Sequence, residues 1–172
     1  MSLSLLVDVL GKYKTNNFIE TGTNLGGGIT TALCVGFKKI YSIEIDPNKY
    51  NKARNIFRFN ENVQIYLGDS KDILSVLIPY LSNEKITFFL DAHSDDYNPL
   101  LDELNIIKNS PRKDHVILID DRRMMGNQDY QCWKYITEKN VIDILKEINP
   151  NYKIEYEDSF NSSKDIIVAW IP

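Results

Sequence analysis

The chain has 172 residues, a hydrophobic fraction of 43%, a charged fraction of 26% and a formal net charge of -4. This length and composition predict one soluble globular domain, residues 1–172, with enough apolar surface for a full core. The acidic balance argues against a nucleic-acid partner, and no apolar run predicts a membrane span or a signal peptide. Cys34 and Cys132 are far apart and lack metal-type spacing, which predicts reduced thiols and a cytoplasmic protein.

Helical and strand-like segments alternate along the chain. A short amphipathic helix carrying Leu3, Leu6, Val7 and Leu10 is expected to end at Gly11. The expected strands are 17–21, 39–45, 63–67, 86–90 and 115–119, followed by a closing hairpin of 153–156 and 166–170. The expected helices are 27–36, 47–58, 71–81, 99–109 and 138–148, and residues 122–136 are expected to be irregular. This order predicts a doubly wound α/β sheet with helices on both faces, whose last strand runs antiparallel.

Acidic residues end the predicted strands of the sheet. They are Glu20, Glu44, Asp69, Asp91, and the adjacent pair Asp120 and Asp121. In an open parallel sheet, ligands bind beyond the carboxyl ends of the strands, near the point where the strand order reverses. The sequence therefore predicts a ligand site along this edge.

A glycine-rich turn, residues 21–28, follows the first predicted strand. Glycines let the backbone approach a ligand closely, and the helix that follows offers free N–H groups. The spacing G-x-x-x-G-x-G differs from the G-x-G-x-x-G turn that holds pyrophosphate in dinucleotide enzymes. Glu20 lies two residues before Gly22, where it would disfavour a phosphate and accept an ammonium group. A tight structural turn is the alternative interpretation.

Two further strand ends could contact a nucleoside group. Glu44 follows the turn by about twenty residues, where an acid commonly accepts hydrogen bonds from ribose hydroxyls. A solvated carboxylate is the alternative. Asp69 and Ser70 could reach an adenine amino group, although both residue types are also ordinary N-caps for the next helix.

The carboxylates of Asp91, Asp120 and Asp121 are expected to lie close together, because the fourth and fifth strands should be neighbours about 4.8 Å apart. Their mutual repulsion would raise a pKa or require a cation. Oxygen ligands favour Mg²⁺, Ca²⁺ or Mn²⁺ over zinc. Asp120 and Asp121 can converge only if the chain is already turning there, since side chains alternate faces along a strand. The alternative is that the doublet only caps a turn.

These features together resemble the class I S-adenosylmethionine (SAM) methyltransferases: E-x-G-x-x-x-G-x-G, an acid after the second strand, G-D-S after the third, and a terminal hairpin. The resemblance covers nearly the whole chain. It implies a seven-stranded, mostly parallel sheet of order 3-2-1-4-5-7-6 with strand seven antiparallel. It places Glu20 and Gly22 near the methionine part of SAM, Glu44 at the ribose, and Asp69 and Ser70 at the adenine. The implied cofactor-binding residues are Glu20, Gly22, Thr23, Asn24, Gly26, Gly28, Glu44, Asp69, Ser70 and Asp91.

The acids after strands four and five resemble those of metal-dependent O-methyltransferases, both the catechol type and, more closely, the macrocin-type sugar enzymes. The resemblance implies that Asp91, Asp120 and Asp121 hold Mg²⁺. His93 stands where the macrocin-type enzymes carry a catalytic Asp, so His93 and Asp91 are the expected catalytic residues. Histidine titrates near neutral pH and could remove the proton of an acceptor hydroxyl. A structural histidine is the alternative.

The expected function is SAM-dependent, metal-dependent O-methylation of a small molecule, with a sugar hydroxyl as the favoured acceptor. Tyr130 and Trp133 could stack on the acceptor or simply cover the sheet edge, and Asp95, Asp96 and Tyr97 could line the acceptor pocket. A metal-independent methyltransferase and a non-catalytic SAM-binding module are the alternatives. A homodimer and an association with a glycosyltransferase are both compatible with the sequence.

Overall fold

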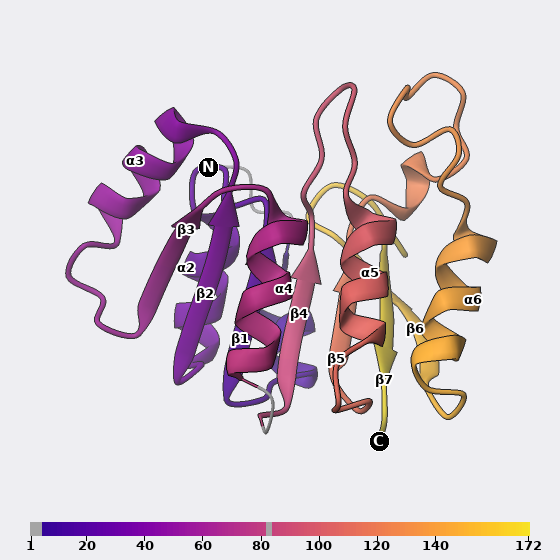
Figure 1. Cartoon of the computed structure of the whole chain (residues 1–172), viewed down its shortest axis with the longest axis horizontal. Helices are drawn as coiled ribbons and strands as arrows, with labels where there is room; N and C mark the ends of the chain where they lie inside the picture. The colour runs from indigo at the N-terminus through magenta and orange to yellow at the C-terminus, as the bar shows by residue number, and fades with distance from the viewer. Residues whose placement is uncertain (1–4, 82–83) are drawn as a thin grey trace.

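The computed structural model describes residues 5–81 and 84–172 of the chain (Figure 1). The strands are β1 (Asn17–Thr21), β2 (Lys39–Glu44), β3 (Val63–Leu67), β4 (Ile86–Leu90), β5 (Val116–Ile119), β6 (Lys153–Glu157) and β7 (Ile166–Trp170). The helices are α1 (Val7–Lys12), α2 (Gly27–Val35), α3 (Pro47–Ile56), α4 (Ser70–Tyr80), α5 (Leu100–Lys108), α6 (Glu138–Ile148) and the 3₁₀ helix η1 (Arg122–Met124).

All seven strands join one sheet, in the order β3-β2-β1-β4-β5-β7-β6. Strand β7 pairs antiparallel with β5 and β6, and the other neighbouring strands pair parallel. The predicted fold class and strand order are therefore confirmed. Within the described ranges, none of the helices combines the length and apolar character needed to cross a membrane.

Two predicted boundaries are corrected. The first helix continues through Gly11 to Lys12, since a glycine inside a helix costs only about 1 kcal/mol and Leu10 anchors this turn in the core. Leu3, also assigned to that helix, lies outside the described residues. The fifth strand begins at Val116, and the His115 ring instead accepts a hydrogen bond from the backbone N–H of Ile86 at 3.3 Å. Other predicted ends differ by one or two residues, as is usual for helix and strand termini.

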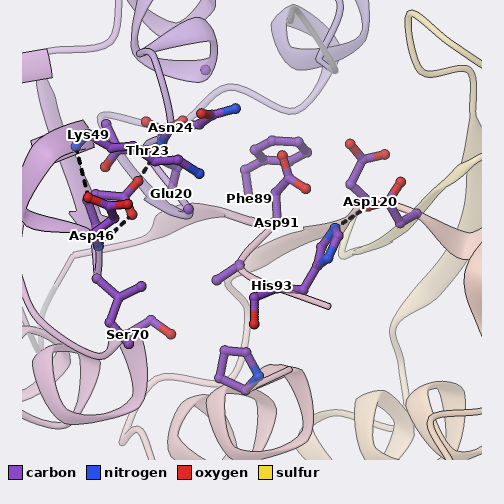
Figure 2. A pocket seen from close by; sticks show the side chains of 18 of the residues that line it. Glu20, Thr23, Asn24, Asp46, Lys49, Ser70, Phe89, Asp91, His93 and Asp120 are labelled. Carbon is purple, nitrogen blue, oxygen red and sulfur yellow. Dashed lines mark hydrogen bonds and ion pairs between the residues drawn. The ribbon is translucent and has the colours of Figure 1, made fainter. Parts of the chain in front are cut away.

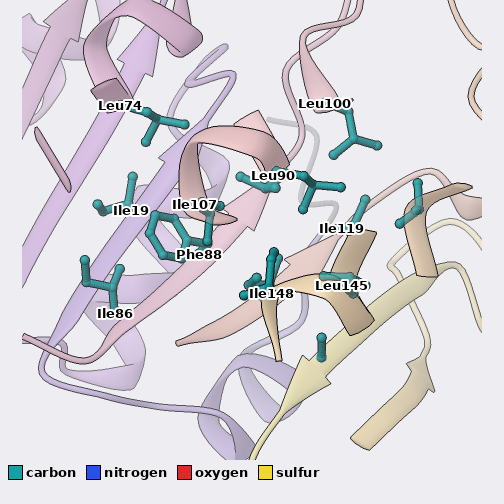
Figure 3. Packing of buried hydrophobic residues seen from close by; sticks show 14 of the residues in the cluster. Ile19, Leu74, Ile86, Phe88, Leu90, Leu100, Ile107, Ile119, Leu145 and Ile148 are labelled. Atoms are coloured by element: carbon teal, nitrogen blue, oxygen red, sulfur yellow. The ribbon is translucent and has the colours of Figure 1, made fainter. Parts of the chain in front are cut away.

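Each face of the sheet is covered by three helices. Helices α4, α5 and α6 bring apolar side chains onto one face, where Leu74, Ile107 and Leu145 are fully buried (Figures 1 and 3). Helices α1, α2 and α3 cover the other face, with Leu10 and Ile29 at its centre. Strands β1, β4 and β5 are buried along their whole length, as expected for central strands of a parallel sheet.

The parallel pairing brings the strand ends of the predicted site together. Thr21 of β1 pairs with Leu90 of β4, and Leu90 pairs with Ile119 of β5. The residues that follow these partners, Asp91 and Asp120, therefore leave the sheet side by side. The segments after β4 and β5 project beyond this edge (Figure 1).

Candidate active site

A cavity of about 690 Å³ opens at the carboxyl ends of the strands, within the range of roughly 300–1,000 Å³ typical of small-molecule sites. Its wall includes nine of the ten predicted cofactor-binding residues: Glu20, Gly22, Thr23, Asn24, Gly28, Glu44, Asp69, Ser70 and Asp91. The tenth, Gly26, lies behind the turn, where a Cβ would meet the Phe57 ring at 2.3 Å. His93, Asp120 and Asp121 line the same cavity.

The turn after β1 is built around the carboxyl group of Glu20. A Cβ on Gly28 would lie 1.8 Å from Glu20 Oε2, so only glycine leaves room for this side chain. Ser42 donates a hydrogen bond to Glu20 Oε1 at 2.6 Å. Burial raises the pKa of Glu20 to about 8, and the charge of Glu44 adds to this, while hydrogen bonds from Ser42 and the Ile29 backbone oppose it. A cationic ligand group beside Glu20 would favour its ionised form.

The Glu44 carboxylate is fixed by the backbone of two loops. The N–H of Asn24 donates to Oε2 at 2.7 Å, and the N–H of Asp46 donates to Oε1 at 2.9 Å. Asn24 adopts the left-handed conformation, with φ of 48°. Each carboxylate oxygen accepts more than one hydrogen bond, so Glu44 keeps the capacity to accept from hydroxyls of a ligand in the cavity.

Asp69 caps the N-terminus of helix α4 and also accepts a hydrogen bond from Tyr97. Its Oδ1 accepts from the N–H of Lys71 at 3.2 Å and caps α4, which is the structural alternative considered for this residue. Its Oδ2 accepts from the hydroxyl of Tyr97 at 2.7 Å. Tyr97 belongs to the segment after β4, so this bond joins that segment to the half of the cavity around Asp69. Ser70 Oγ is buried without a hydrogen-bond partner among the described residues.

The acids after β4 and β5 form two groups that share Asp121. Asp91, His93 and Asp121 each offer a ligand atom within 4.8 Å of the others, and so do Asp120, Asp121 and Asp165. The structure thus places Asp91 and Asp120 in different groups. Asp121 adopts the left-handed conformation, with φ of 58°, which supplies the early turn that the sequence argument required for the doublet.

His93 lines the cavity, and its ring points toward the side where Asp120 lies (Figure 2). Its Nε2 lies 2.8 Å from Asp121 Oδ2. The edge of the His93 ring packs against Trp133, with ring centroids 5.5 Å apart and planes at 68°. Trp133 is only 4% exposed, so it covers the sheet edge, whereas Tyr130 is 43% exposed.

A cation that the sequence did not predict lies inside the acidic cluster. The Arg123 guanidinium lies 2.7 Å from Asp121 Oδ1 and also pairs with Asp165, which accepts a further bond from the Arg123 backbone N–H at 3.0 Å. Asp165 is 1% exposed and comes from the β6–β7 connection. Burial and the charge of Asp121 raise the pKa of Asp120 to about 7. No sequence pattern predicts that Asp165 belongs to this cluster. The only sequence feature that connects Arg123 with it is that Arg123 follows the acidic doublet.

No protein-family model matches the sequence, and no curated protein matches it. Solved structures share the fold at low identity. A methyltransferase from Geobacter sulfurreducens is 12% identical, with a TM-score of 0.62 over 95% of this chain and 74% of its own. The O-methyltransferase TomG from Streptomyces achromogenes, solved with SAM, is 12% identical, with a TM-score of 0.61 over 96% and 77%.

The methyltransferase MycE from the mycinamycin biosynthetic pathway, solved with Mg, SAH and mycinamycin VI, is 12% identical with a TM-score of 0.64. The match covers 95% of this chain and 47% of MycE, so this chain spans about half of that protein. The strand order 3-2-1-4-5-7-6 and the antiparallel seventh strand agree with these likenesses. The chain has the fold of the class I SAM-dependent methyltransferases.

Proposed function

We propose that the chain is a SAM-dependent O-methyltransferase that uses a divalent metal and acts on a hydroxyl of a small molecule, with a sugar hydroxyl as the favoured acceptor. One observation carries the proposal: a single cavity is lined both by the turn around Glu20 and Glu44 and by the group Asp91, His93 and Asp121. A cofactor and an acceptor bound there would lie next to each other, and holding reactants together is a large part of catalysis.

The residues of the turn suit SAM. The buried carboxyl of Glu20 would gain a cationic neighbour, Glu44 is oriented to accept from ribose hydroxyls, and Asp69 is held at the cavity wall by Tyr97. Bound SAM supplies an electrophilic methyl group, and a bound divalent cation lowers the pKa of an acceptor hydroxyl. The carboxylates of Asp91 and Asp121 would hold that cation, beside the imidazole of His93.

His93 is the proposed general base. In the tautomer that carries the proton on Nε2, His93 donates to Asp121, and the lone pair of Nδ1 is left to accept the acceptor's proton. Asp121 orients the ring and stabilises the imidazolium that forms, as a carboxylate does in other acid–base pairs. The T-shaped contact with Trp133 holds the same ring from another side. Positioned bases of this kind typically contribute about 10²–10⁴-fold to the rate.

A metal-independent methyltransferase is the second candidate, and Arg123 is the observation that favours it. Its guanidinium already occupies Asp121 Oδ1, so the acidic cluster contains a positive charge of its own. In this case the pair His93 and Asp121 would remove the proton without help from a cation. Activity that survives EDTA would select this candidate, and activity lost with EDTA and restored by Mg²⁺ or Mn²⁺ would select the metal-dependent one.

A small-molecule acceptor is supported by the likeness to MycE, which was solved with mycinamycin VI, and the choice of a sugar hydroxyl rests on the resemblance of the acids after β4 and β5 to those of the macrocin-type enzymes. In this chain, Asn161 lies at the cavity wall, where it would contact such a molecule, whereas Tyr130 is not among the residues that line the cavity. A panel of sugars and glycosides, assayed with SAM labelled on the methyl group, tests the acceptor class.

Calorimetric titration of SAM into the wild type, Asp121→Ala and Asp143→Ala tests the site. Asp143 is an exposed acid of α6 that pairs with Lys139, so its substitution controls for the loss of one charge. We expect all three proteins to bind SAM, and only Asp121→Ala to lose methyl transfer, by about 10²-fold or more. Equal loss of binding and turnover in Asp121→Ala would assign Asp121 to the cofactor site. A wild type that does not bind SAM would refute the proposal.

A further inference from the structure

A second, much smaller cavity adjoins the candidate site and shares Asp91 and Asp120 with it. Its volume is about 10 Å³, close to the lower limit for one water molecule and too small for anything larger. Besides Asp91, its polar lining comes from four side chains: Asn98 of the β4–α5 segment, Glu103 of α5, Asp120 after β5, and Trp133 of the stretch before α6.

Each of these four side chains carries a buried polar atom that makes no hydrogen bond of ordinary geometry among the described residues, although the hydroxyls of Ser70 and Thr21 lie near the Glu103 carboxyl and the Cys132 thiol lies near the Asn98 amide. The atoms are Asn98 Nδ2, both carboxyl oxygens of Glu103, Asp120 Oδ1 and Trp133 Nε1. Glu103 is 1% exposed, Asp120 is 3% exposed and Trp133 is 4% exposed. A buried polar group left unpaired costs about 1–3 kcal/mol, so four of them around one cavity would consume much of a domain's stability of about 5–15 kcal/mol.

The four groups divide into two donors and two acceptors. The indole N–H of Trp133 and the amide of Asn98 donate, whereas the carboxyl groups of Glu103 and Asp120 accept. A water molecule accepts two hydrogen bonds and donates two, so its capacity matches this lining. A metal ion does not match it, because two N–H donors would face the positive charge.

We propose that one internal water molecule occupies this cavity as a fixed part of the site. It accepts hydrogen bonds from Asn98 and Trp133 and donates hydrogen bonds to Glu103 and Asp120. The water thereby joins the acid after β5 to helix α5 and to the tryptophan that packs on His93. This inference rests on the described side chains alone and holds whether or not the chain transfers a methyl group.

Water-selective NOE and ROE spectra of protein labelled with ¹⁵N in the tryptophan side chains test the proposal directly. The chain has two tryptophans, so two indole signals are expected. Trp170 is the matched control, because its Nε1 donates directly to Glu155 at 3.0 Å. The variant Trp170→Phe assigns the signals. We expect the Trp133 indole proton to show dipolar cross-relaxation with a long-lived water, and the Trp170 proton to show none.

A Trp133 signal without such a cross-peak, or with one that has the sign of chemical exchange only, would overturn the proposal. A high-resolution crystal structure gives an independent answer. Density for one water within about 2.7–3.2 Å of all four groups would support the proposal. Trp133 bonded directly to either carboxyl group, with no water between them, would refute it.

Discussion

Replacing Gly28 by alanine is expected to destabilise the fold through Glu20. A Cβ at position 28 would lie 1.8 Å from Glu20 Oε2 and 3.0 Å from Cδ, well inside van der Waals contact. A flexible exposed side chain would move aside at little cost. Glu20 cannot do so, because it is 2% exposed and accepts the hydrogen bond from Ser42.

The expected loss is about 2–4 kcal/mol of the free energy of unfolding. Forcing an extra methyl group into a packed site costs about 1–3 kcal/mol. Moving the Glu20 carboxyl away from Ser42 leaves a buried group unpaired, at about 1–3 kcal/mol more. Position 28 lies in the first turn of α2, where alanine's better helix propensity returns at most about 1 kcal/mol. For a chain of this length, the net loss corresponds to a fall in Tm of roughly 5–15 °C.

Urea unfolding of the wild type, Gly28→Ala and Gly11→Ala measures this. Gly11 is a matched control, because it lies in helix α1 and a Cβ there would meet nothing within 4 Å. Alanine at Gly11 should therefore be neutral or stabilise by up to about 1 kcal/mol. A loss of less than about 0.5 kcal/mol in Gly28→Ala, within the range of ordinary surface substitutions, would show that the Glu20 carboxyl is not confined as described.

Three further predictions concern buried charge around the site. Burial raises the pKa of Glu103 to about 7, so the wild type loses stability as the pH rises from the ordinary glutamate value through 7. Glu103→Gln mimics the protonated form and does not lose stability in this way. The free energy of unfolding of the variant minus that of the wild type, measured in urea, should therefore rise by roughly 3 kcal/mol from about pH 5 to pH 8. Arg123→Met should destabilise by about 3 kcal/mol, because the buried Asp165 loses its positively charged partner and keeps only hydrogen bonds from Ser159 and the backbone N–H of residue 123. Mg²⁺ should then raise the Tm of this variant more than that of the wild type, which differential scanning fluorimetry can compare. Tyr97→Phe removes the bond to Asp69 and should weaken SAM binding by up to about tenfold in calorimetry.

The sequence predicts the sheet and the line of acids along its edge because both depend on local pattern. Apolar runs mark the buried strands, and parallel pairing then forces their carboxyl ends to meet. The register Thr21–Leu90–Ile119 brings the backbone of Asp91 beside that of Asp120, while their carboxylates fall into two groups that share Asp121. The same logic places the glycine turn at the cavity, since the turn follows the central strand β1 directly.

Contacts made between loops could not be predicted in this way. Arg123 meets Asp165 across 42 positions of the chain, and the path of the β6–β7 connection decides that meeting. The left-handed conformation of Asp121 turns its carboxylate toward His93, and asparagine and aspartate adopt this conformation without any flanking signal. The sequence around Trp133 does not show whether its ring is buried against the sheet edge or exposed for stacking on a ligand.

The guanidinium of Arg123 compensates only part of the negative charge of the acidic cluster. Asp120, Asp121 and Asp165 lie within one small volume with a single guanidinium, so full ionisation would leave two uncompensated negative charges. Burial and the charge of Asp121 raise the pKa of Asp120 to about 7, which is consistent with this excess of negative charge. A divalent cation would have to compete at Asp121, whose two oxygens already face Arg123 and His93. Metal binding should therefore displace one of these partners. It should also strengthen as the pH rises, because Asp120 then loses its proton and adds a negative charge to the cluster.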